Sequence, residues 1–137
     1  MSWRIPLFDP DLGIEEEQAL VEVIHSKWLT MGDKTAAFEI WEQLGQQAPD
    51  WVITPVGHGT MLLGLTNGFD YLLRAGMIQR LPRIVGVQAS AVAPLAAAMA
   101  QQVDRLPKVV PGDTLADGIA IARPLRWQQI LGAVRAT

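Results

Sequence analysis

Two short apolar runs, each followed by a helical pattern, constrain the fold of this chain more than any other feature. The runs are Trp51 to Val56 and Pro82 to Gln88, and their lengths and flanking turns are typical of buried strands. Helices are predicted after them, from Thr60 to Ala75 and from Val92 to Gln102. This alternation favours parallel strands joined by right-handed crossovers, with helices on both faces of the sheet. The predicted class is α/β, a partial three-layer α/β/α fold with a short, mostly parallel sheet.

The other periodic segments predict further helices and one short strand. The helices are Ile14 to Lys27, Lys34 to Leu44 and Pro124 to Ala136, the last with its proline in the first turn. The strand is expected within Leu115 to Ala122. Half of the 137 residues are hydrophobic, which is enough for one core of ordinary size but not for two complete domains.

Composition excludes several classes of function. The 11 Lys and Arg residues are scattered and outnumbered by 14 Asp and Glu, so no nucleic-acid surface is expected. Cysteine is absent, and two distant histidines without a carboxylate cluster do not make a metal site. The most apolar stretch, residues 84–100, is interrupted by polar residues and a proline, so no membrane span is expected. The start lacks a signal-peptide pattern, and a cytoplasmic protein is predicted.

The segment Thr54-Pro-Val-Gly-His-Gly-Thr60 carries the strongest signal for a binding site, because it joins the end of a strand to the start of a helix. The first N–H groups of a helix have no acceptor within it and can hold an anion at the positive end of the dipole. Gly57 and Gly59 would let the backbone approach a ligand, and the Thr60 hydroxyl and His58 could contact a phosphate. Gly57, His58, Gly59 and Thr60 are therefore the candidate cofactor-binding residues.

This loop also has interpretations other than a phosphate site. The glycines could form only a tight strand-to-helix turn, with His58 a loop residue of no catalytic role, and these residues alone leave that alternative open. A dinucleotide site is excluded because the next glycine is Gly64 and because Gln88, not an acidic residue, ends the second strand. An NTP-binding P-loop is excluded because no Lys-Ser or Lys-Thr pair follows.

Five segments, in order along the chain, carry a family resemblance. They are Lys34-Thr-Ala-Ala-Phe-Glu-Ile-Trp-Glu-Gln-Leu-Gly45, Ala48-Pro-Asp-Trp-Val-Ile-Thr-Pro-Val-Gly-His-Gly-Thr60, Leu81-Pro-Arg-Ile-Val-Gly-Val-Gln88, Thr114-Leu-Ala-Asp-Gly-Ile-Ala-Ile121 and Pro124-Leu-Arg-Trp-Gln-Gln-Ile-Leu131. Together they resemble threonine synthases and their relatives among the fold-type-II pyridoxal-phosphate (PLP) enzymes. In that family the loop resembling Gly57 to Thr60 binds the cofactor phosphate. The resemblance thus implies PLP as the cofactor and lyase-type chemistry in amino-acid metabolism.

The same resemblance implies that part of the catalytic apparatus is missing from this sequence. The family's Schiff-base lysine lies in a serine-rich segment upstream of the matched region, whereas Lys27, Lys34 and Lys108 have no such setting. The chain also ends at Thr137, before the family's contact to the cofactor ring nitrogen. We therefore assign no catalytic residue and leave open whether the chain is an enzyme. The prediction is a family fragment that is inactive alone and binds PLP weakly or noncovalently, if at all.

Residues 1–33 carry a different resemblance. Ile5-Pro-Leu-Phe-Asp-Pro-Asp-Leu-Gly13 and Lys27-Trp-Leu-Thr-Met-Gly32 are similar to the opening of DegT/StrS-type sugar aminotransferases, which are PLP enzymes of the unrelated fold type I. The expected organisation is an N-terminal segment, residues 1–33, joined to a threonine synthase-like domain, residues 34–137.

Three functions follow from these features. The favoured one is a partial threonine synthase-type enzyme whose partner is a phosphate-bearing small molecule. The second is a non-enzymatic association module, because part of a sheet should expose apolar surface and a strand edge that favour a homo-oligomer or another partner. The third, an active DegT/StrS-type aminotransferase, rests only on residues 1–33 and is disfavoured by the missing lysine.

Overall fold

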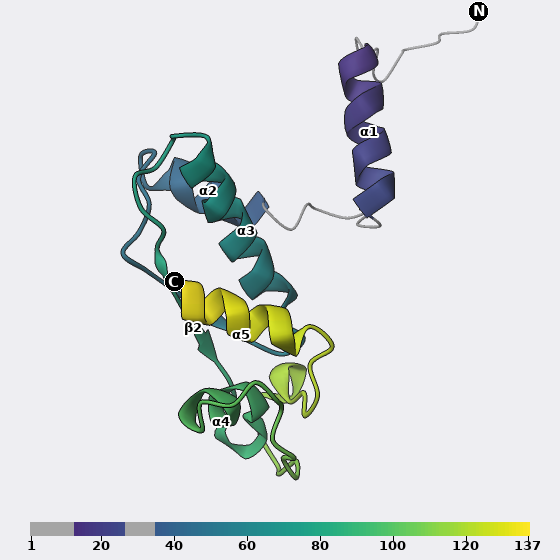
Figure 1. Cartoon of the computed structure of the whole chain (residues 1–137), viewed down its shortest axis with the longest axis vertical. Coiled ribbons are helices and arrows are strands. Elements are labelled where there is room, and N and C mark those ends of the chain that lie inside the picture. Colours follow the sequence, from purple (N-terminus) through teal and green to yellow (C-terminus); the bar gives the residue numbers. More distant parts are fainter. Residues whose placement is uncertain (1–12, 27–34) are drawn as a thin grey trace, which may run out of the picture. The chain divides into compact units, whose positions relative to one another are not determined.

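The computed structural model describes residues 13–26 and 35–137 of a chain that divides into two compact units, Met1–Gly32 and Asp33–Thr137. The first unit contains helix α1, Ile14–Ser26 (Figure 1). Ile14 and Val21 of this helix are exposed. His25 lies in its last turn, where the negative end of the helix dipole stabilises a positively charged side chain. The helix predicted in this segment is confirmed up to Ser26, and Lys27 lies outside the described residues.

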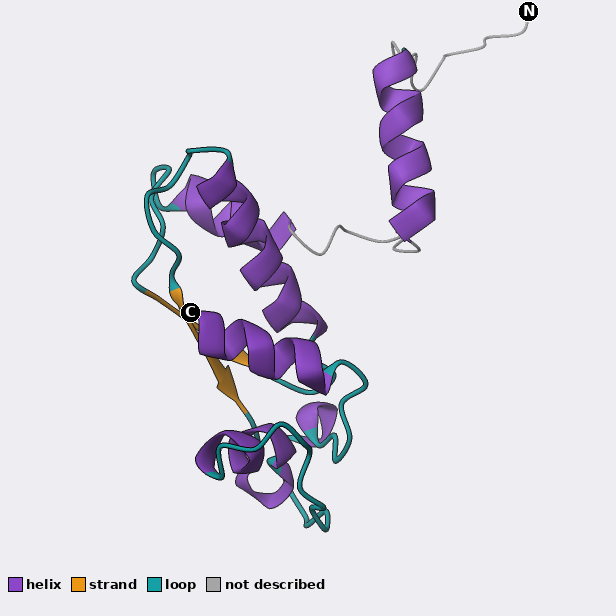
Figure 2. Ribbon diagram, viewed as in Figure 1, coloured by secondary structure: helices purple, strands orange, loops and turns teal. Residues whose placement is uncertain are grey.

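The second unit is built around a two-stranded parallel sheet (Figure 2). Strand β1, Trp51–Pro55, aligns with strand β2, Arg83–Val87, so that Val52 lies opposite Ile84. Helix α3, Thr60–Arg74, connects the strands, as expected for a parallel crossover. The mixed α/β class and the short parallel sheet predicted from the sequence are confirmed.

The other helices of this unit pack around α3 and β2. Helix α2, Thr35–Gln43, lies along α3 (Figure 1), and the Phe38 ring meets the Tyr71 ring edge-on with a centroid distance of 5.7 Å. Helix α5, Trp127–Ala136, contacts α3, β2 and the short helix α4, Pro94–Ala100. None of the helices in the described ranges has the length and apolar character needed to cross a membrane.

The core lies where α3 and α5 meet the sheet. Leu62, Leu65, Phe69 and Leu72 recur at helical spacing along α3 and are each at most 3% exposed. The buried side chains that join them include Val52 and Ile84 from the strands and Ile130 and Leu131 from α5. The helical period of α3 therefore places its apolar residues toward the sheet.

Helix α3 ends where the sequence predicts. Gly76 has a φ of 71°, its N–H donates to the Leu73 carbonyl at 3.0 Å, and the Met77 N–H donates to the Leu72 carbonyl at 2.9 Å. This pair of bonds is a Schellman motif, which requires a left-handed residue after the helix, and glycine adopts that conformation without steric strain.

The opposite face of the sheet, where the sequence also predicts helices, is not covered by the helices of the second unit. Side chains alternate along β1, so Val52 and Thr54 are buried, whereas Trp51 is 54% and Ile53 is 70% exposed. Val87 of β2 lies on the open face and is 46% exposed. Within residues 35–137, only one face of the sheet is therefore packed.

The C-terminal part of the unit departs from the prediction in two places. No strand forms between Leu115 and Ala122. Instead, Asp117–Ile119 forms a single 3₁₀ turn, in which the Ala120 N–H donates to the Asp117 carbonyl at 3.0 Å. Local bonds thus satisfy this backbone where a strand would have needed a partner edge. Helix α5 begins at Trp127, and the predicted start, Pro124, lies buried in the preceding turn.

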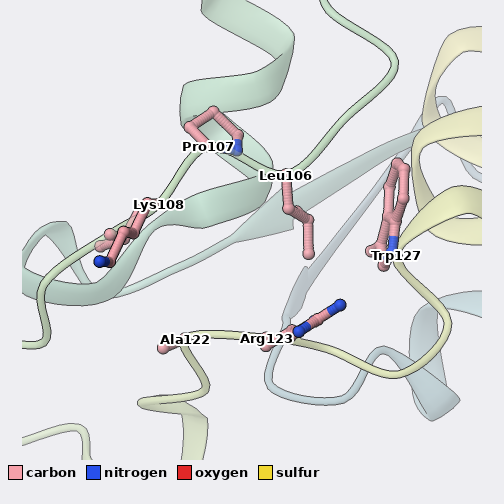
Figure 3. A pocket seen from close by; sticks show the side chains of 7 residues that line it. Leu106, Pro107, Lys108, Ala122, Arg123 and Trp127 are labelled. Carbon is pink, nitrogen blue, oxygen red and sulfur yellow. The ribbon is translucent and has the colours of Figure 1, made fainter.

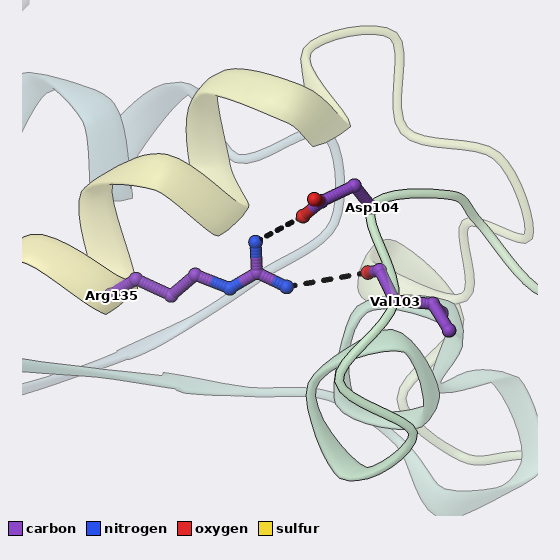
Figure 4. Close-up of polar contacts among 3 residues, drawn as sticks. All are labelled: Val103, Asp104 and Arg135. Carbon is purple, nitrogen blue, oxygen red and sulfur yellow. Dashed lines mark hydrogen bonds and ion pairs between the residues drawn. The ribbon is translucent and has the colours of Figure 1, made fainter.

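An ion pair fastens the end of α5 to the segment that follows α4. The Arg135 guanidinium pairs with the Asp104 carboxylate and also donates to the Val103 carbonyl at 3.3 Å (Figure 4). The Asp104 side chain is 85% exposed, so the pair contributes at most about 1 kcal/mol to stability. The pair links the last turn of α5 to the segment after α4.

Candidate functional site

The candidate loop follows β1 directly and ends at the first turn of α3. The Val56 N–H donates to the Val87 carbonyl at 2.8 Å, which continues the pairing of the strands up to Gly57. Gly59 is the N-cap of α3, with φ 83° and ψ 10°, and its carbonyl accepts the Leu63 N–H at 3.0 Å. The loop therefore lies at the carboxyl end of the sheet, where open parallel sheets bind ligands.

The first turn of α3 offers free hydrogen-bond donors. Gly59 has no side chain to cap the helix, and no acidic residue lies in the first turn. In the described part of the chain, no acceptor is found for the N–H groups of Thr60, Met61 and Leu62. The Thr60 side chain is half-buried and Met61 is exposed, so solvent reaches this end of the helix. The arrangement gives a local excess of positive potential.

Both loop glycines face protein atoms. A Cβ at Gly59 would overlap Ile130 Cδ1 and lie 2.7 Å from Ile130 Cγ1. A Cβ at Gly57 would lie 3.3 Å from the Gly118 carbonyl oxygen, so the 3₁₀ turn at Asp117–Ile119 covers this side of the loop. Glycine at both positions is therefore explained by close packing of α5 and of this turn. Neither position leaves an open cradle for a ligand.

A shallow cavity lies beside the loop. It has a volume of about 320 Å³ and is lined by His58, Thr60, Leu125 and Arg126. His58 and Thr60 come from the candidate loop, whereas Leu125 and Arg126 come from the turn before α5. The lining side chains include two basic groups and no carboxylate.

The structure divides the predicted site residues into two groups. His58 and Thr60 line the cavity, while Gly59 lies against Ile130 of α5 and Gly57 lies against the 3₁₀ turn at Asp117–Ile119. Lys108 lines a different cavity, of about 440 Å³, whose lining also includes Arg123 and Trp127 (Figure 3). Lys27 and Lys34 lie outside the described residues.

Sequence reasoning missed Arg126. Its approach to the loop depends on how α5 packs on α3, and neither periodicity nor spacing encodes that contact. The only sequence signal was the family resemblance of residues 124–131, which carried no role for the arginine.

The comparisons identify the family. A family model for pyridoxal-phosphate dependent enzymes matches residues 14–135. The chain belongs to this family. Over 133 residues it is 36% identical to threonine synthase of Methanocaldococcus jannaschii, covering 93% of this chain and 33% of that protein. Over 104 residues it is 39% identical to threonine synthase of Synechocystis, covering 76% of this chain and 25% of that protein.

A shorter match links the chain to chloroplastic threonine synthase 2 of Arabidopsis thaliana, at 42% identity over 64 residues, 47% of this chain and 12% of that protein. The chain thus spans a third or less of the length of these relatives. The family implies pyridoxal phosphate as the cofactor. Because the family match begins at residue 14, it includes α1.

The chemistry of the loop fits the phosphate group of that cofactor. The start of α3 has free N–H groups, the lining residues Thr60 and Arg126 both carry side-chain donors, and no acidic side chain lines the cavity. Backbone amides at a helix N-terminus and arginine side chains both favour phosphate oxygens. The fit concerns the phosphate alone, since no lysine lines this cavity.

Proposed function

We propose that this chain provides the phosphate-binding part of a fold-type-II, threonine synthase-type PLP enzyme acting in amino-acid metabolism. In this proposal the segment Gly57, His58, Gly59 and Thr60 holds the cofactor phosphate noncovalently, and the chain alone does not turn over substrate. Bound pyridoxal phosphate would supply an electron sink for lyase-type chemistry at an amino acid. The residues described here would bind and orient it.

The observation that carries the proposal is the cavity beside the free amides of α3. Thr60, the first residue of α3, lines this cavity together with His58. A phosphate at this position would be stabilised by charge–dipole attraction and by direct hydrogen bonds. Packing of Ile130 against Gly59 keeps the start of α3 in place, so the donors are positioned before a ligand arrives.

The expected lack of turnover rests on the lysines. Lys108 lines another cavity, and neither it nor Lys27 or Lys34 lies in a serine-rich segment like the one expected around the family's Schiff-base lysine. Without a lysine at the cofactor, the family's covalent attachment has no protein group to form it.

A pair of ligands that differ only in the phosphate tests the proposal. Pyridoxamine 5′-phosphate cannot form a Schiff base with a lysine, so its affinity reports the noncovalent site. We expect calorimetric titration to show at least about tenfold tighter binding of pyridoxamine 5′-phosphate than of pyridoxamine, because only the ester reaches the loop donors. Equal affinities for the two compounds would contradict a phosphate-binding loop.

A second candidate function is self-association through the open face of the sheet. Trp51, Ile53 and Val87 form an exposed apolar surface on this face, and the Arg83 guanidinium lies 5.0 Å from the Trp51 ring centroid. The outer edge of β1 contains Pro55, which has no N–H, so pairing of a further strand there would be interrupted. The apolar face is therefore better suited to contact a second copy than the strand edge is.

Sedimentation velocity over a range of protein concentrations tests this candidate. The native chain is expected to associate, and Ile53→Glu is expected to shift it toward the monomer by placing a charge on the apolar face. Leu115→Glu is the matched control, because Leu115 is fully exposed in a loop outside the sheet. Equal association of the two variants would rule out the sheet face as the contact.

The aminotransferase alternative gains no support from the site. It rests on residues 1–33, of which residues 14–33 fall within the PLP-enzyme family match. Residues 1–12 and 27–34, which include much of the resemblance, lie outside the described residues.

A further inference from the structure

Arg126 is directed to the loop by the packing of α5. It lies four residues before Ile130, and the Ile130 N–H donates to the Arg126 carbonyl at 3.0 Å, which places both residues on one side of the helix. Ile130 is 1% exposed and fills the position that a Cβ of Gly59 would occupy. The contact that buries Ile130 therefore also brings Arg126 to the cavity lined by His58 and Thr60.

Most other arginines in the described ranges have a clear structural partner. Arg74, Arg80 and Arg135 pair with carboxylates, and Arg83 lies over an indole ring. Arg126 makes no ion pair with a described residue, and its cavity contains no acidic side chain. Arg126 is exposed and also lines a second cavity, beside Thr66 and Gln129, which likewise contains no carboxylate.

The start of α3 adds positive potential beside this charge. Positive side chains are stabilised near the C-terminus of a helix and destabilised near the N-terminus, where the dipole is positive. Arg126 lies beside the first turn of α3, which has free N–H groups and no acidic residue. An anion in the cavity would offset the repulsion between these positive groups. It would also accept hydrogen bonds from the N–H groups of α3 and from the Arg126 side chain.

We propose that Arg126 is a second phosphate-binding element, whose guanidinium contacts the cofactor phosphate held by the amides at the start of α3. The inference rests on the proposed function, because it assigns a further side chain to the same site. Arg126 is a binding residue in this scheme and takes no part in bond breaking. Its planar fork of donors matches two phosphate oxygens, which a lysine at the same position would not.

The test compares Arg126→Gln and Arg126→Lys with the native chain, using inorganic phosphate and pyridoxamine 5′-phosphate as ligands. Dissociation constants are read from amide shifts of Gly59 and Thr60. We expect Arg126→Gln to weaken binding of both ligands about tenfold, within the range for a hydrogen bond to a charged group, and Arg126→Lys to weaken it less. The matched control is Arg123→Gln, which removes the same charge from the neighbouring cavity and should change affinity less than about twofold.

A measurement on the native chain complements the variants. The Arg126 Nε–H resonance, assigned by its disappearance in Arg126→Lys, should shift during the phosphate titration with the same dissociation constant as the Thr60 amide. If the loop amides respond but Arg126→Gln binds phosphate as tightly as the native chain, the inference is overturned and the proposed function stands. If the loop amides of the native chain do not respond at all, both are overturned.

Discussion

The contact between Gly59 and Ile130 makes Gly59→Ala a demanding substitution. An alanine there must adopt a φ near 83°, in the left-handed region, at a cost of about 1–2 kcal/mol. Its Cβ would also overlap Ile130 Cδ1 and lie 2.7 Å from Cγ1, and overpacking a core contact costs about 1–3 kcal/mol. We expect Gly59→Ala to lower the free energy of unfolding by about 2–5 kcal/mol, the sum of these two costs.

A double-mutant cycle separates the two costs. Ile130→Ala removes both atoms that the new Cβ would meet, and by itself should destabilise the chain by about 2–5 kcal/mol. In that background Gly59→Ala should cost only the backbone part, about 1–2 kcal/mol, which gives a coupling energy of about 1–3 kcal/mol. Urea unfolding followed by circular dichroism measures each corner of the cycle.

Gly132→Ala is the matched control for this cycle. Gly132 lies on the exposed side of α5 with no atom within 4 Å of an added Cβ, so alanine should stabilise the chain by about 0.5–1 kcal/mol through helix propensity. Strict additivity of Gly59→Ala and Ile130→Ala would refute the packing explanation. A neutral Gly59→Ala would refute the backbone explanation as well.

Three further outcomes are expected. Incubation with PLP followed by borohydride should leave no single lysine stoichiometrically labelled, because none of the three lysines has the family's setting, and mass spectrometry of one uniquely modified peptide would contradict this. A shortened chain that begins at Met31 should keep its hydrogen-exchange protection in Trp51–Val56 and Arg83–Gln88, since the unit boundary falls after Gly32. Global unfolding of this shortened chain would show that the N-terminal segment is an integral part of one domain. Gln88→Ala should cost about 1 kcal/mol in thermal unfolding, because the Gln88 side chain accepts N–H bonds at 2.9 and 3.2 Å at the start of α4, and an unchanged melting temperature would argue against this cap.

Much of the fold could be predicted because it is encoded locally. The apolar run ending at Pro55, the glycine turn and the period of α3 specify a strand, a turn and a helix without reference to distant residues. Gly76 likewise ends α3 through bonds to residues within the same helix. These elements follow from backbone preferences and from the spacing of apolar side chains.

The errors arose where the answer depends on distant parts of the chain. An apolar strand has the same sequence signature whether one or both of its faces are covered, so the exposure of Ile53 could not be predicted from residues 51–56. The segment 115–122 has apolar residues suitable for a strand, but it bonds locally around Asp117. The position of Arg126 on the cavity depends on the packing of α5, and no local pattern in residues 124–131 predicts it.

The central claim is that the turn between β1 and α3 binds phosphate. An amide chemical-shift titration of the native chain with inorganic phosphate tests it most directly, because the loop amides report a bound anion without any variant. The account predicts that Gly57, His58, Gly59 and Thr60 show the largest, saturable shifts, since Thr60 provides the first free N–H of α3 and the other three residues lead directly into it. Large saturable shifts elsewhere, with these four amides unchanged, would contradict it.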